Sequence, residues 1–146
     1  MIFALALALF AGLLLPLQAG INSGLRVSLG HPLLATFASF LVGTVGLALV
    51  LVGARVPLPQ PTTLANSTWW EWAGGLLGAV YILVSIVVAP RLGAATMIAT
   101  IVAGQMLASL LLDHFGLVGY VPHAVNGWRL LGALLVVGGA ILIQRH

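Results

Sequence analysis

Five long apolar runs, separated by short polar or proline- and glycine-rich segments, dominate the sequence. A helix needs about 20 mostly apolar residues to cross a hydrocarbon layer roughly 30 Å thick, and each run approaches or exceeds that length. We therefore expect an all-α membrane protein with a single membrane domain covering residues 1–146. Its five transmembrane helices are predicted over residues 2–27, 33–52, 69–89, 94–112 and 128–143.

Turn-forming residues set these limits. His31-Pro32 precedes the second run, where proline suits a helix start. After that run, Val56-Pro-Leu-Pro-Gln-Pro61 places prolines at alternate positions, which a helix does not accommodate, so 56–68 is predicted as a loop outside the membrane. Pro90-Arg-Leu-Gly93 predicts a tight turn that makes the third and fourth helices a hairpin. The chain has no basic residue before Arg26, so the first run is predicted to be a retained helix, not a cleaved signal peptide.

Composition removes several classes of protein. Hydrophobic residues make up 62% of the chain and charged residues only 5%, against roughly 25% charged in soluble domains. The five basic residues are arginines spread along the chain, not the basic patch of a nucleic-acid binder, so no nucleic-acid partner is expected. There is no cysteine, and the histidines lack metal-ligand spacing. We expect no metal, no cofactor and no enzyme, because no nucleophile–base pair can be placed at membrane depth.

The distribution of the arginines gives only a weak preference for one orientation in the membrane. With loops alternating between the two sides, Arg55 and Arg129 lie on the side of the N-terminus, and Arg26, Arg91 and Arg145 lie on the other. The positive-inside rule orients a membrane protein by its basic-residue bias, and this bias is one residue. Either both orientations are inserted or that single charge suffices, and the sequence leaves both open.

An odd number of helices places the two ends of the chain on opposite sides. Two such units in opposite orientations would reproduce the inverted-repeat symmetry of many secondary transporters. We therefore expect an antiparallel homodimer with inverted-repeat-like symmetry in the lipid bilayer. Small residues that let helices approach closely are present at Gly20-x-x-x-Gly24, Ser39-x-x-x-Gly43, Gly74-x-x-x-Gly78 and Gly138-Gly139.

Uncharged polar residues inside the apolar runs are the best pointers to a site, because lipid cannot satisfy them. Gln18 and Asn22 share a helix face just after Pro16, which removes one backbone hydrogen bond. They are predicted to bind substrate, and the alternative for Asn22 is an interhelical clamp. Thr36 and Ser39 are expected to bond their own helix backbone.

The third and fourth runs carry a second polar group. Tyr81 is followed one turn later by Ser85, and Gln105 lies near the middle of the next run. The predicted hairpin brings these residues together as substrate-binding residues, with a structural polar pair as the alternative. Trp72 belongs to a tryptophan cluster typical of the membrane interface and could wall an entrance.

No carboxylate falls at mid-depth, which removes the usual device for exchanging protons against a cationic substrate. Glu71 and Asp113 both lie at predicted helix ends. Glu71 is favourable in a first helical turn. Asp113 with His114 could form a gate or a proton relay, or a helix-end hydrogen-bonding group beside Gly116.

Four separated motifs occur in order with a suitable spacing. They are Pro16-Leu-Gln-Ala-Gly-Ile-Asn-Ser-Gly-Leu25, His31-Pro32 with Ser39-Phe-Leu-Val-Gly43, Trp72-Ala-Gly-Gly-Leu-Leu-Gly78, and Gly104-Gln105 with Asp113-His-Phe-Gly116. Over nearly its whole length the chain resembles the YdcZ-like family of the drug/metabolite transporter superfamily. The resemblance implies a five-helix protein of the bacterial inner membrane, related to the small multidrug resistance exporters that work as antiparallel dimers.

Those small exporters use a glutamate in the first helix, where this chain has Gln18 as its nearest polar residue. The sequence therefore predicts a secondary transporter with a site between two copies, for a neutral, zwitterionic or weakly anionic organic solute. The alternative is a non-transporting membrane subunit whose glycines and amides only hold partners together.

Overall fold

The computed structural model describes all residues from Met1 to His146, and every regular element in it is helical. Five helices are long and apolar enough to cross a membrane, as predicted. The chain divides into two compact units, Met1–Pro90 and Arg91–His146, which are described separately here. The single membrane domain therefore stays a prediction.

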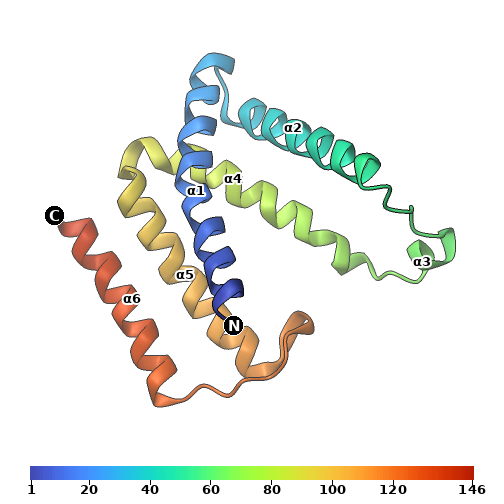
Figure 1. The fold of residues 1–146 in the computed structure, drawn as a ribbon. Helices are drawn as coiled ribbons and strands as arrows, with labels where there is room; N and C mark the ends of the chain where they lie inside the picture. The colour runs from blue at the N-terminus through green and yellow to red at the C-terminus, as the bar shows by residue number, and fades with distance from the viewer. The chain divides into compact units, whose positions relative to one another are not determined.

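The first unit contains α1 (Ile2–Leu29), α2 (Pro32–Gly53) and the part of α4 (Ala73–Leu92) up to Pro90. Gly30, in the left-handed conformation at φ 75°, ends α1 and turns the chain. His31 then caps α2, since its Nδ1 accepts a hydrogen bond from the Leu33 N–H at 3.2 Å. From this turn α1 and α2 diverge (Figure 1).

The helix α4 packs against the other two where they are joined. Ala35 of α2 and Ile82 and Ile86 of α4 form a buried cluster, with Leu25 of α1 and Tyr81 packed against it. Further along, the Phe40 ring lies over Gly78, where a Cβ would sit 3.5 Å from Cζ. Gly20, Gly24, Gly43 and Gly74 have no such neighbour within the chain, which leaves their faces open.

The segment before α4 is more ordered than predicted. A short helix α3 (Pro61–Ala65) lies within the expected loop, because Pro61 takes a first-turn position where its missing N–H costs nothing. The 3-10 helix η1 (Trp69–Trp72) then precedes α4, so regular α-helix begins at Ala73 and not at residue 69. At the start of η1 the Glu71 side chain completes a capping box, because it accepts a hydrogen bond from the Thr68 N–H at 2.7 Å.

The other helix limits either agree with the prediction, as at Ile2 and Ala94, or differ from it by one to three residues. The predicted turn at 90–93 is mostly wrong, because α4 continues through Pro90 to Leu92 and only Gly93, at φ 76°, breaks the helix. Pro90 removes one backbone hydrogen bond and its ring crowds the carbonyl of Ile86 four residues earlier, yet the helix extends two residues beyond it.

The second unit is a hairpin of α5 (Ala94–Phe115) and α6 (Gly127–Arg145), joined by a segment that contains the 3-10 turn η2 (Leu117–Gly119). Asn126 caps α6 by accepting from the Arg129 N–H at 2.9 Å. Gly116 ends α5 at φ 61°, and a Cβ there would lie 2.6 Å from Pro122 Cγ.

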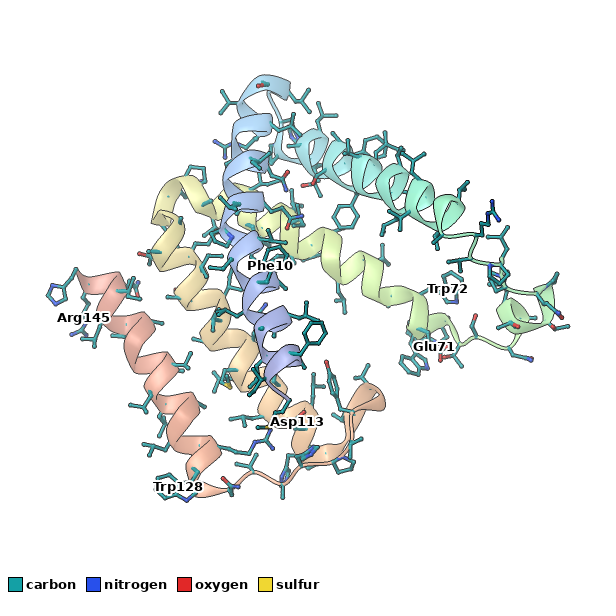
Figure 2. All side chains as sticks on the ribbon, in the orientation of Figure 1. Phe10, Glu71, Trp72, Asp113, Trp128 and Arg145 are labelled. Carbon is teal, nitrogen blue, oxygen red and sulfur yellow. The ribbon has the colours of Figure 1, made fainter.

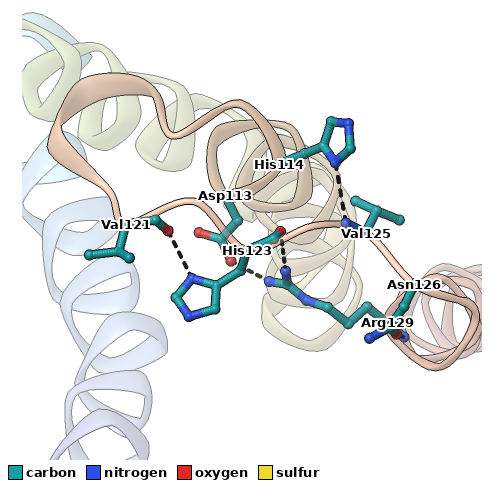
Figure 3. A network of polar contacts seen from close by, with 7 residues as sticks. All are labelled: Asp113, His114, Val121, His123, Val125, Asn126 and Arg129. Atoms are coloured by element: carbon teal, nitrogen blue, oxygen red, sulfur yellow. Dashed lines mark hydrogen bonds and ion pairs between the residues drawn. The ribbon is translucent and has the colours of Figure 1, made fainter.

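A polar network, which we call the Asp113–Arg129 clasp, ties the end of α5 to the start of α6 (Figure 3). The Arg129 guanidinium pairs with the Asp113 carboxylate through Nη2 and donates through Nη1 to the His123 carbonyl at 2.7 Å. The His123 N–H donates to the Asp113 carbonyl at 2.7 Å. His114 Nδ1 accepts from the Val125 N–H at 3.2 Å, so the loop is held at both ends.

We expect Arg129→Gln to lower the unfolding temperature of the detergent-solubilised protein, because charged hydrogen bonds of this kind contribute about 1.5–3 kcal/mol each to the folded state. Tryptophan fluorescence during heating measures it, since Trp128 adjoins the clasp. Arg145→Gln, at the other end of α6, is the matched control and should change little. Strictly additive effects of Arg129→Gln and Asp113→Asn in the double variant would contradict the clasp.

Gly116→Ala should destabilise the protein more than Gly119→Ala. Both glycines have positive φ, which costs an alanine roughly 1–2 kcal/mol. Only Gly116 has a close neighbour for the added Cβ, the Pro122 ring, whereas Gly119 faces open space. The same heating experiment compares the two, and equal losses of stability would mean that the Pro122 contact relaxes freely.

Candidate substrate-binding site

A groove of about 870 Å³ lies between α1 and α2. Three polar residues line it, Gln18 and Asn22 from α1 and Ser39 from α2. The rest of the lining is apolar and consists of Ala11, Leu14, Leu15, Leu17, Ile21, Leu25, Ala38 and Val42. We call this hollow the α1–α2 groove, and it gathers both of the polar residues predicted on the first helix.

A smaller hollow of about 220 Å³ lies where α1, α2 and α4 come together. Gln18 and Ser39 line it as well, with Thr44 from α2 and Ile82 from α4. Phe40, Gly43 and Leu47 complete its lining. Because Gln18 and Ser39 border both hollows, a polar solute in either one can reach an amide and a hydroxyl.

The hydrogen bonding of Asn22 is the feature of the groove that the sequence did not predict. Asn22 is only 4% exposed, yet its amide nitrogen has no hydrogen-bond partner in the structure. The adjacent hydroxyl of Ser23 is buried without a partner too. Buried polar atoms in proteins are nearly always paired, so these two groups lack a partner that the first unit does not supply. The amide nitrogen makes no clamp to another helix of the first unit.

Tyr81 and Ser85 lie on the face of α4 that packs against α2. Ser85 is buried and its hydroxyl donates to the Tyr81 carbonyl at 2.8 Å, within its own helix. The half-buried Tyr81 packs against the cluster of Ala35, Ile82 and Ile86. Neither Tyr81 nor Ser85 lines the smaller hollow, whose only lining residue from α4 is Ile82.

Gln105 is exposed on α5 and belongs to the second unit. Its predicted meeting with Tyr81 and Ser85 concerns both units and stays a prediction. Within the second unit, Ser109 and Arg129 line a hollow of about 370 Å³ between α5 and α6, together with Met106, Leu110, Gly132, Ala133 and Val136.

The residues predicted at an entrance or gate are all engaged at helix ends. Trp72 donates from Nε1 to the Ser67 hydroxyl at 2.9 Å, beside the Glu71 cap at the start of α4 (Figure 2). Asp113 pairs with Arg129, and His114 bonds the Val125 N–H. Asp113 and His114 do not bond each other, which supports the helix-end interpretation over a relay between them.

The sequence did not predict the roles of two polar residues, Ser39 in the hollows of the first unit and Arg129 in the clasp. Ser39 was expected to bond its own backbone, as Thr36 does to the Pro32 carbonyl at 3.0 Å, but it lines both hollows instead. Its four-residue spacing from Gly43, which also lines the smaller hollow, was the available signal. Arg129 was treated only as an orienting charge, although its sixteen-residue separation from Asp113 across a predicted hairpin loop made an ion pair possible.

Comparison with known proteins agrees with this architecture. Residues 3–142 match the model of a family described as "Putative inner membrane exporter, YdcZ". The chain is 32% identical over 142 residues to the inner membrane protein YdcZ of Escherichia coli strain K12, covering 97% of this chain and 95% of the relative. No solved structure matches.

The match extends over almost the full length of both chains, and the relative is named an inner membrane protein. This agrees with five apolar helices and with the multi-pass location in the bacterial inner membrane that the resemblance implied. The chain belongs to the YdcZ family of drug/metabolite transporters.

Proposed function

We propose that this protein is a secondary transporter that moves small organic solutes across the inner membrane. The observation that carries this proposal is the α1–α2 groove, a hollow near the middle of two membrane-spanning helices that contains two amides and a hydroxyl. Hydrocarbon cannot satisfy such groups, and intramembrane polar residues facing a cavity usually mark a substrate pathway. The family's description as an exporter supports the same role.

The working unit is an antiparallel homodimer, with the substrate between the two copies and alternating access by rocking one against the other. Five helices make one copy equivalent to half of an inverted-repeat transporter. Support comes from the α1 face that carries Gly20 and Gly24, which is open within the chain and suits close approach of another helix. In the dimer, Gln18, Asn22, Tyr81, Ser85 and Gln105 line the site, with Trp72, Asp113 and His114 nearer the surfaces.

The substrate is a neutral, zwitterionic or weakly anionic organic solute. Both acidic residues of the chain are engaged at helix ends, Glu71 in a capping box and Asp113 in the clasp. No carboxylate lines either hollow of the first unit to neutralise a cation. Tight binding of a lipophilic cation, abolished by Asp113→Asn, would refute this assignment.

Reconstituted protein should accelerate the flux of solutes of this class into or out of liposomes. Gln18→Leu and Tyr81→Phe should each slow that flux, since losing a neutral hydrogen bond worth about 0.5–1.5 kcal/mol weakens binding roughly two- to tenfold. Gln105→Ala tests the predicted binding role of Gln105, the one proposed site residue that belongs to the second unit. Gln144→Leu, which removes an amide at the end of α6, is the matched control. If a broad solute panel is neither transported nor stabilises the protein, the non-transporting subunit is the better interpretation.

The antiparallel dimer predicts that copies of both orientations are present in one membrane. The chain has no cysteine, so His146→Cys introduces a unique thiol at the C-terminus. A membrane-impermeant maleimide should label about half of the copies from each side of the inner membrane, as the small arginine bias leads us to expect. Labelling of every copy from one side only would refute dual insertion.

A further inference from the structure

The unpaired amide of Asn22 in the lining of the α1–α2 groove specifies what kind of polar group a ligand must bring. The Asn22 amide nitrogen is buried without a partner, and so is the hydroxyl of the next residue, Ser23, which is not part of the groove lining. An amide nitrogen can only donate, so its missing partner is a hydrogen-bond acceptor. Leaving it unpaired is costly, and that cost is relieved when a carbonyl or carboxylate oxygen arrives.

The positive charge of Arg26, near Asn22, also favours a head group that accepts hydrogen bonds over a cationic one. Arg26 follows Asn22 by four residues and therefore lies on the same face of α1, one turn nearer the helix end. No acidic residue lies on α1 or α2 to offset it. A cationic head group would meet a like charge there, whereas a carboxylate would meet an opposite one.

The remainder of the groove is suited to an apolar body. On α1 its polar lining is confined to Gln18 and Asn22, while the positions toward the N-terminus, from Ala11 to Leu17, are all apolar. That stretch extends about 9 Å along the helix axis. The groove is thus amphiphilic along its length, with hydrogen-bond donors at one end and hydrocarbon at the other.

We propose that the α1–α2 groove binds amphiphilic solutes whose head group is a carbonyl or carboxylate held by the Asn22 amide, with an apolar tail along Ala11–Leu17. This inference rests on the proposed function and names the substrate class of that site. Head groups that only donate hydrogen bonds, such as alkylammonium ions, cannot pair with the Asn22 amide nitrogen and carry the same charge as Arg26, so we expect them to be disfavoured at this end of the groove.

Nuclear magnetic resonance can observe the Asn22 amide directly. The chain has three asparagines, Asn22, Asn66 and Asn126, so selective ¹⁵N labelling gives three side-chain amide pairs. Asn22→Leu identifies the relevant pair by its disappearance. Octanoate and octanamide should shift the Asn22 signals and leave those of Asn66 and Asn126 in place. Octylammonium, which has the same tail, should shift none of them.

The Asn22→Leu variant gives a second, independent readout. Replacing an unpaired buried amide by an apolar side chain of similar size should leave the ligand-free protein as heat-stable as before or more so. Octanoate should bind this variant at least about tenfold more weakly, as expected when a charged hydrogen bond is lost. Asn66→Leu, in the segment before α4, is the matched control and should bind octanoate normally.

The outcomes separate the two proposals. If octylammonium shifts the Asn22 amide as much as octanoate does, or octanoate shifts nothing, the acceptor assignment is overturned. Loss of heat stability in Asn22→Leu without ligand would make Asn22 a structural clamp and overturn it as well. Either result leaves the flux assay free to establish transport of other solutes, whereas absence of flux for every solute refutes the transporter and not the amide contact.

Discussion

Hydrocarbon offers no hydrogen-bond partner, and this constraint decides where every polar group of the chain can lie. The backbone meets it by forming helices, which pair their own N–H and C=O groups inside each apolar run. Helix ends are the places where pairing within the helix fails. The chain supplies side-chain partners at several of them, including His31 before α2, Glu71 before α4 and Asn126 before α6.

The same constraint separates the polar side chains into two groups. Several of those near helix ends are paired within the chain. The Asp113–Arg129 clasp pairs two opposite charges and also bonds the backbone of the joining loop. The polar groups of the α1–α2 groove are different, because Gln18 and Ser39 border open hollows and Asn22 has an unpaired amide nitrogen. The buried amide of Asn22 therefore stands apart from the helix-end groups, and it is the place where we expect a further partner to bind.

The helices could be predicted from sequence because apolar length alone decides which segments enter a bilayer. The short helices and the exact helix breaks were harder to predict from the sequence. The alternate prolines correctly excluded a long helix but hid the short α3, which begins at Pro61. Pro90 was interpreted as part of a turn, although the helix is interrupted only at Gly93, which has a positive φ.

The candidate site, like the fold, could be predicted in part. Gln18 and Asn22 could be found because amides inside apolar runs are conspicuous, and four-residue spacing places them on one face. Ser39 and Arg129 could not, because a hydroxyl can bond its own helix and an arginine can simply orient the chain; only tertiary contacts decide between these roles. That Asn22 lacks a partner is likewise a property of packing and not of spacing.

The unequal lengths of the helices connect the groove to the lipid around it. At 1.5 Å per residue, the 28 residues of α1 extend about 42 Å and the 19 residues of α6 about 28 Å, against a hydrocarbon layer of roughly 30 Å. A helix too long for its bilayer accommodates by tilting. Since α1 is one wall of the α1–α2 groove and α2 is shorter, we expect a thinner bilayer to tilt α1 further and so to change the width of the groove. The thickness of the membrane would then influence the cavity that contains the unpaired amide.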